Sequence, residues 1–256
     1  MGGGNCNTAS ESYTTIAGGD CNTASGYAAT VGGGAENSAA ANNSTIGGGY
    51  GNIASGNHAT IGGGVNNTSS ATNSTVSGGS GNSAATFSAT VGGGSGNIAS
   101  GSYATVPGGR FAEASHWGEM AYAAGQFAVP GDAQTSLYVL RQTTTNATPT
   151  ELFLDGSGLR LTLAANRTMV FDILVIGFST FGDSGGYQIL GIIKNIDGVT
   201  KFVGNPTVTT LGENIVGWDV AVEDNDTHDA LVIRVTGAVG ATIRWVASVR
   251  TVEVAR

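Results

Sequence analysis

The chain has 256 residues, of which 43 are glycine and 11% are charged, and its formal net charge at pH 7 is −8. Residues 1–110 hold only three of the 18 acidic residues and one of the ten lysines and arginines. This composition offers no basic surface for nucleic acid, and no apolar run approaches the ~18 residues of a membrane span. We therefore exclude nucleic-acid binding and membrane insertion, and residue 1 begins no signal-peptide pattern.

An aliphatic column with a step of fifteen residues begins at Met1, and columns of asparagine and threonine keep the same step. So strict a period is typical of stacked, equal coils, and fifteen glycine-rich residues fit two short strands with tight turns but no helix. We predict that residues 1–110 form a parallel β-solenoid of seven 15-residue repeats, stacked about 4.8 Å apart. The aliphatic column continues through Ile16, Val31, Ile46, Ile61, Val76, Val91 and Val106. Stacking should join Asn22, Asn37, Asn52, Asn67, Asn82 and Asn97 into an amide ladder.

Each coil has little apolar material, namely one Ile or Val and a few alanines. Apolar burial contributes about 25 cal/mol per Å², whereas ordering the backbone costs about 1–2 kcal/mol per residue. We therefore expect a single coil stack to be unstable alone. The sequence predicts a homotrimer in which the aliphatic column lies near the threefold axis as the trimer core.

Three segments resemble a known family of repeats, namely Thr30–Gly34, Gly51–Gly56 and Gly96–Gly109. They are similar to the YadA-type head repeats of trimeric autotransporter adhesins, and similar runs occur in bacteriophage tail fibres. The resemblance covers about residues 1–110. It implies a trimer of left-handed parallel β-rolls.

Two columns of the repeat raise further possibilities. Cys6 and Cys21 are one period apart, hence on adjacent coils, where either a disulfide or two stacked free thiols would fit. The threonine column suggests ice binding, but an ice-binding face typically presents two full threonine columns and this chain has one. We therefore do not favour ice binding as the function.

The repeat pattern ends near residue 110, and residues 111–131 introduce bulky side chains typical of a cap or transition. Residues 132–256 contain β-rich runs separated by turn residues and no helical period, which predicts an antiparallel β-sandwich or jelly roll. The segments Gly131–Arg141 and Ile243–Val254 resemble C-terminal modules of phage tail and fibre proteins. No coiled-coil heptads or membrane-barrel strands follow, which favours a virion fibre over a bacterial surface adhesin.

Candidate reactive groups are few. Asp224, Asp226 and Asp229 lie in one acidic loop that could either bind Ca²⁺ or be a solvated hairpin loop, and we favour the latter. Ser184 lies in a Gly-x-Ser-x-Gly match, but a strand rather than a helix follows it, which favours a glycine-rich turn over a nucleophile. The sequence predicts no enzyme and no cofactor. Paired carboxylates of a glycan depolymerase remain an alternative.

Aromatic side chains could bind a receptor at the loops of the C-terminal region, since rings stack on sugars. The candidates are Phe178, Phe181, Tyr187 and Trp218, although a core position is favoured over a surface position for them. We predict a homotrimeric fibre segment of a virion tail, or an extracellular protein, that attaches to a glycan or protein receptor on a host cell. The alternatives are a structural trimerisation module of a bacterial adhesin and a depolymerase tailspike. Whether the C-terminal domain binds the receptor or only locks the trimer stays open.

Overall fold

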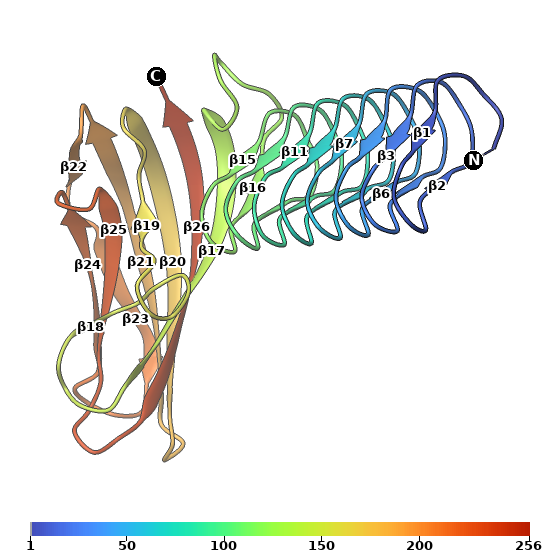
Figure 1. The fold of residues 1–256 in the computed structure, drawn as a ribbon. Helices are drawn as coiled ribbons and strands as arrows, with labels where there is room; N and C mark the ends of the chain where they lie inside the picture. The colour runs from blue at the N-terminus through green and yellow to red at the C-terminus, as the bar shows by residue number, and fades with distance from the viewer. Residues whose placement is uncertain (1) are drawn as a thin grey trace. The chain divides into compact units, whose positions relative to one another are not determined.

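The computed structural model describes residues 2–256 and has no helix among them, which confirms the all-β prediction. The chain divides into two compact units, Met1–Gly131 and Asp132–Arg256, which we call the solenoid and the C-terminal unit (Figure 1). Met1, the first position of the predicted aliphatic column, lies outside the described residues.

The solenoid has about eight coils, and each coil adds one short strand to each of two parallel sheets. Paired residues are fifteen positions apart, as in Ile16 with Val31, which confirms the predicted parallel β-solenoid and its period. The first sheet comprises β1 (Thr8–Ala9), β3 (Thr23–Ala24), β5 (Ser38–Ala39), β7 (Ile53–Ala54), β9 (Thr68–Ser69), β11 (Ser83–Ala84), β13 (Ile98–Ala99) and β15 (Glu113–Ala114). The second comprises β2 (Thr15–Ile16), β4 (Thr30–Val31), β6 (Thr45–Ile46), β8 (Thr60–Ile61), β10 (Thr75–Val76), β12 (Thr90–Val91), β14 (Thr105–Val106) and β16 (Met120–Tyr122).

Left-handed backbone conformations turn the chain at the corners of each coil. At one corner, every non-glycine residue of the column from Tyr13 to Tyr103 has φ between 53° and 62°. At another corner only glycine fits. Gly49 has a φ of 94°, and a Cβ there would overlap the carbonyl oxygen of Gly64 in the next coil. The glycines are therefore required both by the turn and by the close approach of successive coils.

The interior of the solenoid is closed within one chain. The aliphatic column from Ile16 to Val106 is at most 1% exposed, and it packs with buried alanines such as Ala24 and Ala59. The sequence analysis places this column near a threefold axis between chains, but in the structure it fills the inside of a single coil stack. The reason is that small alanine side chains let each thin coil close around one Ile or Val. The trimer itself remains a prediction.

The asparagine side chains seal the remaining side of this interior. The Asn37 amide nitrogen donates to the side-chain oxygen of Asn22 (3.1 Å) and to the carbonyl oxygens of Gly33 (3.0 Å) and Gly49 (2.9 Å). Its own oxygen accepts the backbone N–H of Asn52 (3.1 Å). Each amide thus links three successive coils and satisfies backbone groups that would otherwise be buried without partners.

Residues 111–131 continue the solenoid for one more coil. Thr105 of β14 pairs with Met120 of β16, again fifteen positions on, although the asparagine column has ended. Ala112 stands where the next asparagine would be, and its backbone N–H donates to the side-chain oxygen of Asn97 (2.9 Å). The ladder therefore ends with its last acceptor still satisfied.

The C-terminal unit consists of two antiparallel sheets, seen as two layers in Figure 1. The larger has the order β17-β26-β20-β21-β22, with β23 paired to β21, and the smaller has the order β18-β25-β19, with β24 paired to β25. The strands are β17 (Ala133–Thr144), β18 (Thr150–Glu151), β19 (Leu161–Thr162), β20 (Arg167–Ser179), β21 (Ser184–Ile196), β22 (Val199–Phe202), β23 (Thr207–Glu213), β24 (Asp219–Asn225), β25 (Ala230–Thr236) and β26 (Ile243–Ala255). The antiparallel two-layer arrangement agrees with the predicted sandwich in part.

The core of the C-terminal unit is aromatic, unlike the interior of the solenoid. Trp245 is 1% exposed and packs against Trp218, with ring centroids 5.2 Å apart, and against Tyr187 at 6.5 Å. The Trp245 indole N–H donates to the hydroxyl of Thr144 (3.0 Å), which satisfies its polar group inside the core. The large rings fill the space between the layers.

Candidate functional site

A row of aromatic rings lies on one edge of the solenoid. Phe87, Tyr103 and Trp117 each occupy the corner that follows a strand of the first sheet in three successive coils. The ring centroids of Phe87 and Tyr103 are 5.4 Å apart and those of Tyr103 and Trp117 are 4.6 Å apart, both edge to face. We call these three residues the aromatic row.

The backbone of the corners sets the spacing of the aromatic row. The N–H of Tyr103 donates to the carbonyl oxygen of Phe87 (3.0 Å), and the N–H of Gly118 donates to that of Ser102 (2.9 Å). Phe87 is 43% exposed and Tyr103 is 46% exposed, so about half of each residue faces solvent. The row is a rigid, partly exposed apolar surface one ring wide, a shape that suits stacking against the faces of sugar rings.

A buried carboxylate holds the corner that carries Trp117. Glu119 is 1% exposed and accepts hydrogen bonds from the backbone N–H groups of Ser115 (2.8 Å) and His116 (2.9 Å). Its Oε2 also lies 3.0 Å from Nδ1 of His116. The two donors lie four and three positions before Glu119 in the chain, so the carboxylate fixes this turn. It therefore positions the Trp117 ring rather than offering a free acid.

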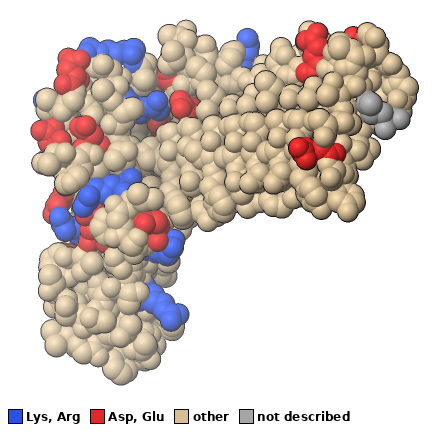
Figure 2. Space-filling model, viewed as in Figure 1, with Lys and Arg blue, Asp and Glu red and all other residues tan. Residues whose placement is uncertain are grey.

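The remaining corners of the same edge are polar and nearly uncharged. They carry Asn42, Asn43, Asn57, His58, Thr72 and Asn73 between the aromatic row and a second ring pair. That pair is Tyr13 and Tyr27, edge to face at 5.4 Å near the other end of the solenoid. In the view of Figure 2 the solenoid surface is almost free of charged side chains. Neutral donors and acceptors beside exposed rings suit a neutral or weakly charged polyhydroxyl ligand.

The aromatic row was not found by the sequence analysis, which placed Trp117 in the cap without a ligand role. Phe87 and Trp117 are two periods apart, and Tyr103 is one residue beyond the position between them. This offset hides the row from a search for one fifteen-residue column. Treating the two corner columns together would have revealed it.

The predicted receptor-binding rings separate into two groups. Phe178, near the end of β20, is 59% exposed, and Phe181, in the turn between β20 and β21, is 74% exposed. Tyr187 and Trp218 are only 2% and 4% exposed, so their prediction as surface rings is corrected. Tyr187 points to the inner face of its sheet because it alternates with the outward-facing positions of β21, and Trp218 directly precedes β24; both rings pack on Trp245.

Two carboxylates approach one buried phenol in the C-terminal unit. The Tyr187 hydroxyl donates to Oε2 of Glu213 (2.7 Å). Burial, followed by the hydrogen bond to Glu213 and then by the charges of Glu213 and Asp219, raises the pKa of Tyr187 well above its usual range. Within residues 2–256, the buried indole N–H of Trp218 has no hydrogen-bond partner. Glu213 and Asp219 themselves are exposed, so this cluster presents two acids to solvent.

The acidic loop stabilises a neighbouring strand. Asp224 accepts the N–H of Phe202 (2.8 Å), Asp226 accepts the N–H of Thr200 (2.6 Å) and Asp229 accepts the hydroxyl of Thr200 (2.8 Å). The sequence suggested these three carboxylates as a weak metal site. In the structure they accept hydrogen bonds from donors of β22. No group of three or more potential metal ligands was found among residues 2–256.

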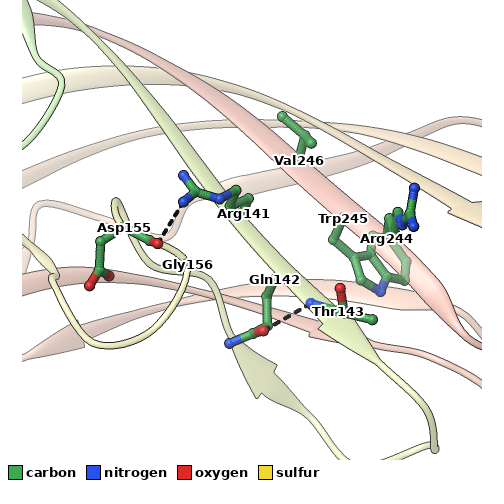
Figure 3. A pocket seen from close by; sticks show the side chains of 8 residues that line it. All are labelled: Arg141, Gln142, Thr143, Asp155, Gly156, Arg244, Trp245 and Val246. Carbon is green, nitrogen blue, oxygen red and sulfur yellow. Dashed lines mark hydrogen bonds between the residues drawn. The ribbon is translucent and has the colours of Figure 1, made fainter.

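A pocket of about 330 Å³ lies in the C-terminal unit, lined by residues of β17, β26 and the 155–156 turn (Figure 3). Arg141 donates to the carbonyl oxygens of Leu154 (3.3 Å) and Asp155 (2.7 Å), whereas Arg244 lines another side. Hydrogen bonds from Ser157 and from nearby backbone N–H groups hold the pKa of Asp155 well below its usual range. The pocket combines two guanidinium groups with one carboxylate that is ionised at neutral pH, which leaves a net charge of +1.

Two predicted reactive positions have ordinary surroundings. Ser184 begins β21, and its N–H donates to the side-chain oxygen of Asn214 (2.7 Å). Cys6 and Cys21 are free thiols in the structure. A hydrogen bond with Cys6, followed by burial and the charge of Asp20, raises the pKa of Cys21 to about 11. A reactive thiolate at Cys21 is therefore disfavoured at neutral pH.

No protein-family model matches the chain, and no characterised protein matches it in sequence. Two similar solved structures are phage tailspikes. The first is tailspike gp49 of Acinetobacter baumannii phage Fri1, a capsular polysaccharide depolymerase, with 10% identity, a TM-score of 0.28, and coverage of 87% of this chain and 46% of that one. The second is the tailspike of Acinetobacter phage vB_ApiP_P1, with 8% identity, a TM-score of 0.23, and coverage of 99% and 54%. The chain thus spans about half the length of these tailspikes.

These comparisons correct one prediction. The sequence analysis predicts that the chain is not an enzyme, whereas gp49 of Fri1, one of the two similar structures, is a polysaccharide depolymerase. The non-enzymatic assignment is therefore withdrawn. No helix of residues 2–256 is long and apolar enough to cross a membrane.

Proposed function

We propose that this chain is a segment of a phage tail fibre or tailspike that binds a host cell-surface polysaccharide along one edge of its solenoid. The observation that carries the proposal is the aromatic row, in which three rings from successive coils stand 4.6 Å and 5.4 Å apart on a nearly uncharged surface. The resemblance of the repeats to adhesin heads and phage fibres supports the same conclusion. In this role the chain is located in the virion tail and acts as a homo-oligomer.

The rigidity of the solenoid explains how such a surface would work. Successive coils hold the rings in register through backbone hydrogen bonds of 2.9–3.0 Å, so little conformational entropy is lost when a ligand binds. A polysaccharide repeats its sugar units and can contact several coils together. Weak contacts at each ring then add up, and copies of the chain in one particle multiply them by avidity.

The test is polysaccharide binding by the intact chain. Capsular and lipopolysaccharide preparations from candidate hosts are screened, and the Kd of the best ligand is measured for Tyr103→Ala and Trp117→Ala. We expect each variant to bind about tenfold more weakly, since a stacked ring contributes about 1.4 kcal/mol. Tyr50→Ala is the matched control, because Tyr50 is 45% exposed but belongs to a different ladder of the solenoid.

An equal loss of affinity in Tyr50→Ala, or unchanged affinity in both row variants, would refute the proposed site. Absence of polysaccharide binding altogether would instead favour the alternative of a structural trimerisation module. Folding of each variant is checked by circular dichroism. A change in binding is then not confused with a change in stability.

A second candidate function is cleavage of the bound polysaccharide, which the pair of exposed carboxylates near Tyr187 favours. Glycoside hydrolysis requires two acids about 5–10 Å apart. Glu213 Oε2 accepts a hydrogen bond from the Tyr187 hydroxyl (2.7 Å), and the charge of Asp219 acts on the same hydroxyl. We expect a decrease in polysaccharide length on incubation with the chain, and its loss in Glu213→Gln and in Asp219→Asn. Cleavage that persists in either variant would exclude this pair.

A further inference from the structure

The outer face of the larger sheet in the C-terminal unit is apolar. Eleven Val, Leu, Ile and Phe side chains on β17, β20, β21 and β26 are 38–63% exposed there. At its centre Leu174, Ile176, Val246 and Leu190 alternate with buried residues, as the two-residue period of a strand requires. An antiparallel sheet that faces water normally carries polar side chains on that side.

The strand register makes these side chains one continuous patch. Ile176 of β20 lies opposite Val246 of β26, and Val170 lies opposite both Val252 of β26 and Ile192 of β21. Apolar patches of this extent are rare on monomeric proteins and mark interaction surfaces. Eleven half-exposed side chains of this size approach the ~800 Å² that each partner contributes to a standard interface.

The polar groups at the centre of this face satisfy one another. Arg250 Nη2 lies 2.6 Å from Oδ2 of Asp172, and Gln188 Nε2 donates to Oδ1 of the same carboxylate (2.9 Å). The charges of Asp172 and Arg250 therefore cancel at the centre of the face, and Arg141 is bonded to backbone carbonyl oxygens. Arg244 and Lys194 lie toward the two ends of the face, so identical apolar centres can approach without bringing these charges together. This favours another apolar, neutral sheet face as the occupant.

We propose that this face packs against further copies of the same chain and forms the main contact of the homo-oligomer. The contact surface is then the outer sheet face of the C-terminal unit, since the aliphatic column of the solenoid is already buried inside one chain. This assignment concerns assembly and is independent of where polysaccharide binds. The predicted trimer would then be held together by this sheet face.

The test compares the mass of the intact chain in solution with that of two variants. Light scattering should give a multiple of the chain mass for the wild type. The double variant Leu174→Lys and Ile176→Lys should raise the Kd for assembly by roughly 30-fold or more, as expected for side chains at the centre of an interface. Val216→Lys is the matched control, because Val216 is 95% exposed but lies outside this face.

A second measurement keeps the proposal testable if the double variant fails to fold. Ser248 lies on the same face between Val139 and Leu174, so Ser248→Cys is a mild change. In a background with Cys6→Ser and Cys21→Ser, the new thiol should react with maleimide at least about tenfold more slowly in the assembled chain than on dilution. A monomeric wild type, or a thiol that reacts equally fast at both concentrations, would overturn the proposal.

Discussion

Removing one amide from the asparagine ladder should be among the most destabilising single changes in the solenoid. Asn52 is fully buried, and its amide nitrogen donates to Asn37 Oδ1, Gly48 O and Gly64 O, each at 3.0 Å. Its side-chain oxygen accepts the N–H of Asn67 (3.0 Å). In Asn52→Ala the Gly64 carbonyl still accepts another N–H, whereas the Gly48 carbonyl and the Asn67 N–H lose the partners found here. Two unsatisfied groups at about 1–3 kcal/mol each give a loss of about 4 kcal/mol in the free energy of unfolding.

The measurement is urea unfolding of the intact chain, followed by circular dichroism at fixed protein concentration, because assembly also stabilises the folded state. Asn57→Ala serves as the control. Asn57 is an exposed asparagine of the same repeat, and its loss should change the free energy of unfolding by less than about 0.5 kcal/mol. Amide hydrogen exchange provides a local readout, since the Asn67 N–H should lose its protection. If the two variants unfold at the same urea concentration, the ladder does not contribute as argued.

Three further predictions concern the corners and the thiols of the solenoid. Gly49→Ala places a Cβ against the backbone of the next coil at a φ of 94° and should cost at least about 3 kcal/mol in urea unfolding, whereas Gly78→Ala has no such clash and should change stability by less than about 1 kcal/mol. Ala28→Gly removes left-handed strain at a φ of 55° and should raise the free energy of unfolding by about 0.5–1 kcal/mol; a loss would contradict this. Because the pKa of Cys21 is raised to about 11, its contribution to stability is present below pH 9 and lost as pH rises through 11; iodoacetamide should alkylate it with a midpoint near pH 11 that falls in Cys6→Ser, and an unchanged midpoint would exclude the thiol pair as the cause.

The period could be predicted from the sequence because one column of residues repeats at a fixed step. Stacked coils bring residue i against residue i+15, so the strand pairing of Ile16 with Val31 follows directly from the step. The end of the solenoid could not be located in the same way. The asparagine column stops at Asn97, but strand pairing continues to Met120, because backbone hydrogen bonds do not depend on that side chain. The asparagine column therefore ends one coil before the solenoid does.

Orientation was harder to predict than position. The sequence identified the aliphatic column but assigned it to an interface, since the apolar material of one coil looked insufficient for a closed interior. Comparing apolar burial with backbone entropy leaves out the asparagine ladder. Its hydrogen bonds satisfy buried backbone groups, so alanine and asparagine side chains can fill the interior beside one Ile or Val. In the C-terminal unit, Tyr187 and Trp218 were candidates for a receptor surface, although a core position was favoured for both. Their neighbours in sequence are glycines, which suggested an exposed loop, whereas the rings fill the space above Trp245.

A continuous face of exposed aliphatic side chains lies on the C-terminal unit, and this changes where assembly should be sought. The aliphatic column of the solenoid, from Ile16 to Val106, is at most 1% exposed and has no apolar surface to share with another chain. The sheet face around Leu174 and Ile176 has a large apolar area and an internally paired Asp172 and Arg250. The proposed contact face and the aromatic row belong to different units of the chain and share no residues. Assembly and polysaccharide binding would then respond to different substitutions, so Leu174→Lys with Ile176→Lys should reduce avidity while leaving the intrinsic affinity of each aromatic row unchanged.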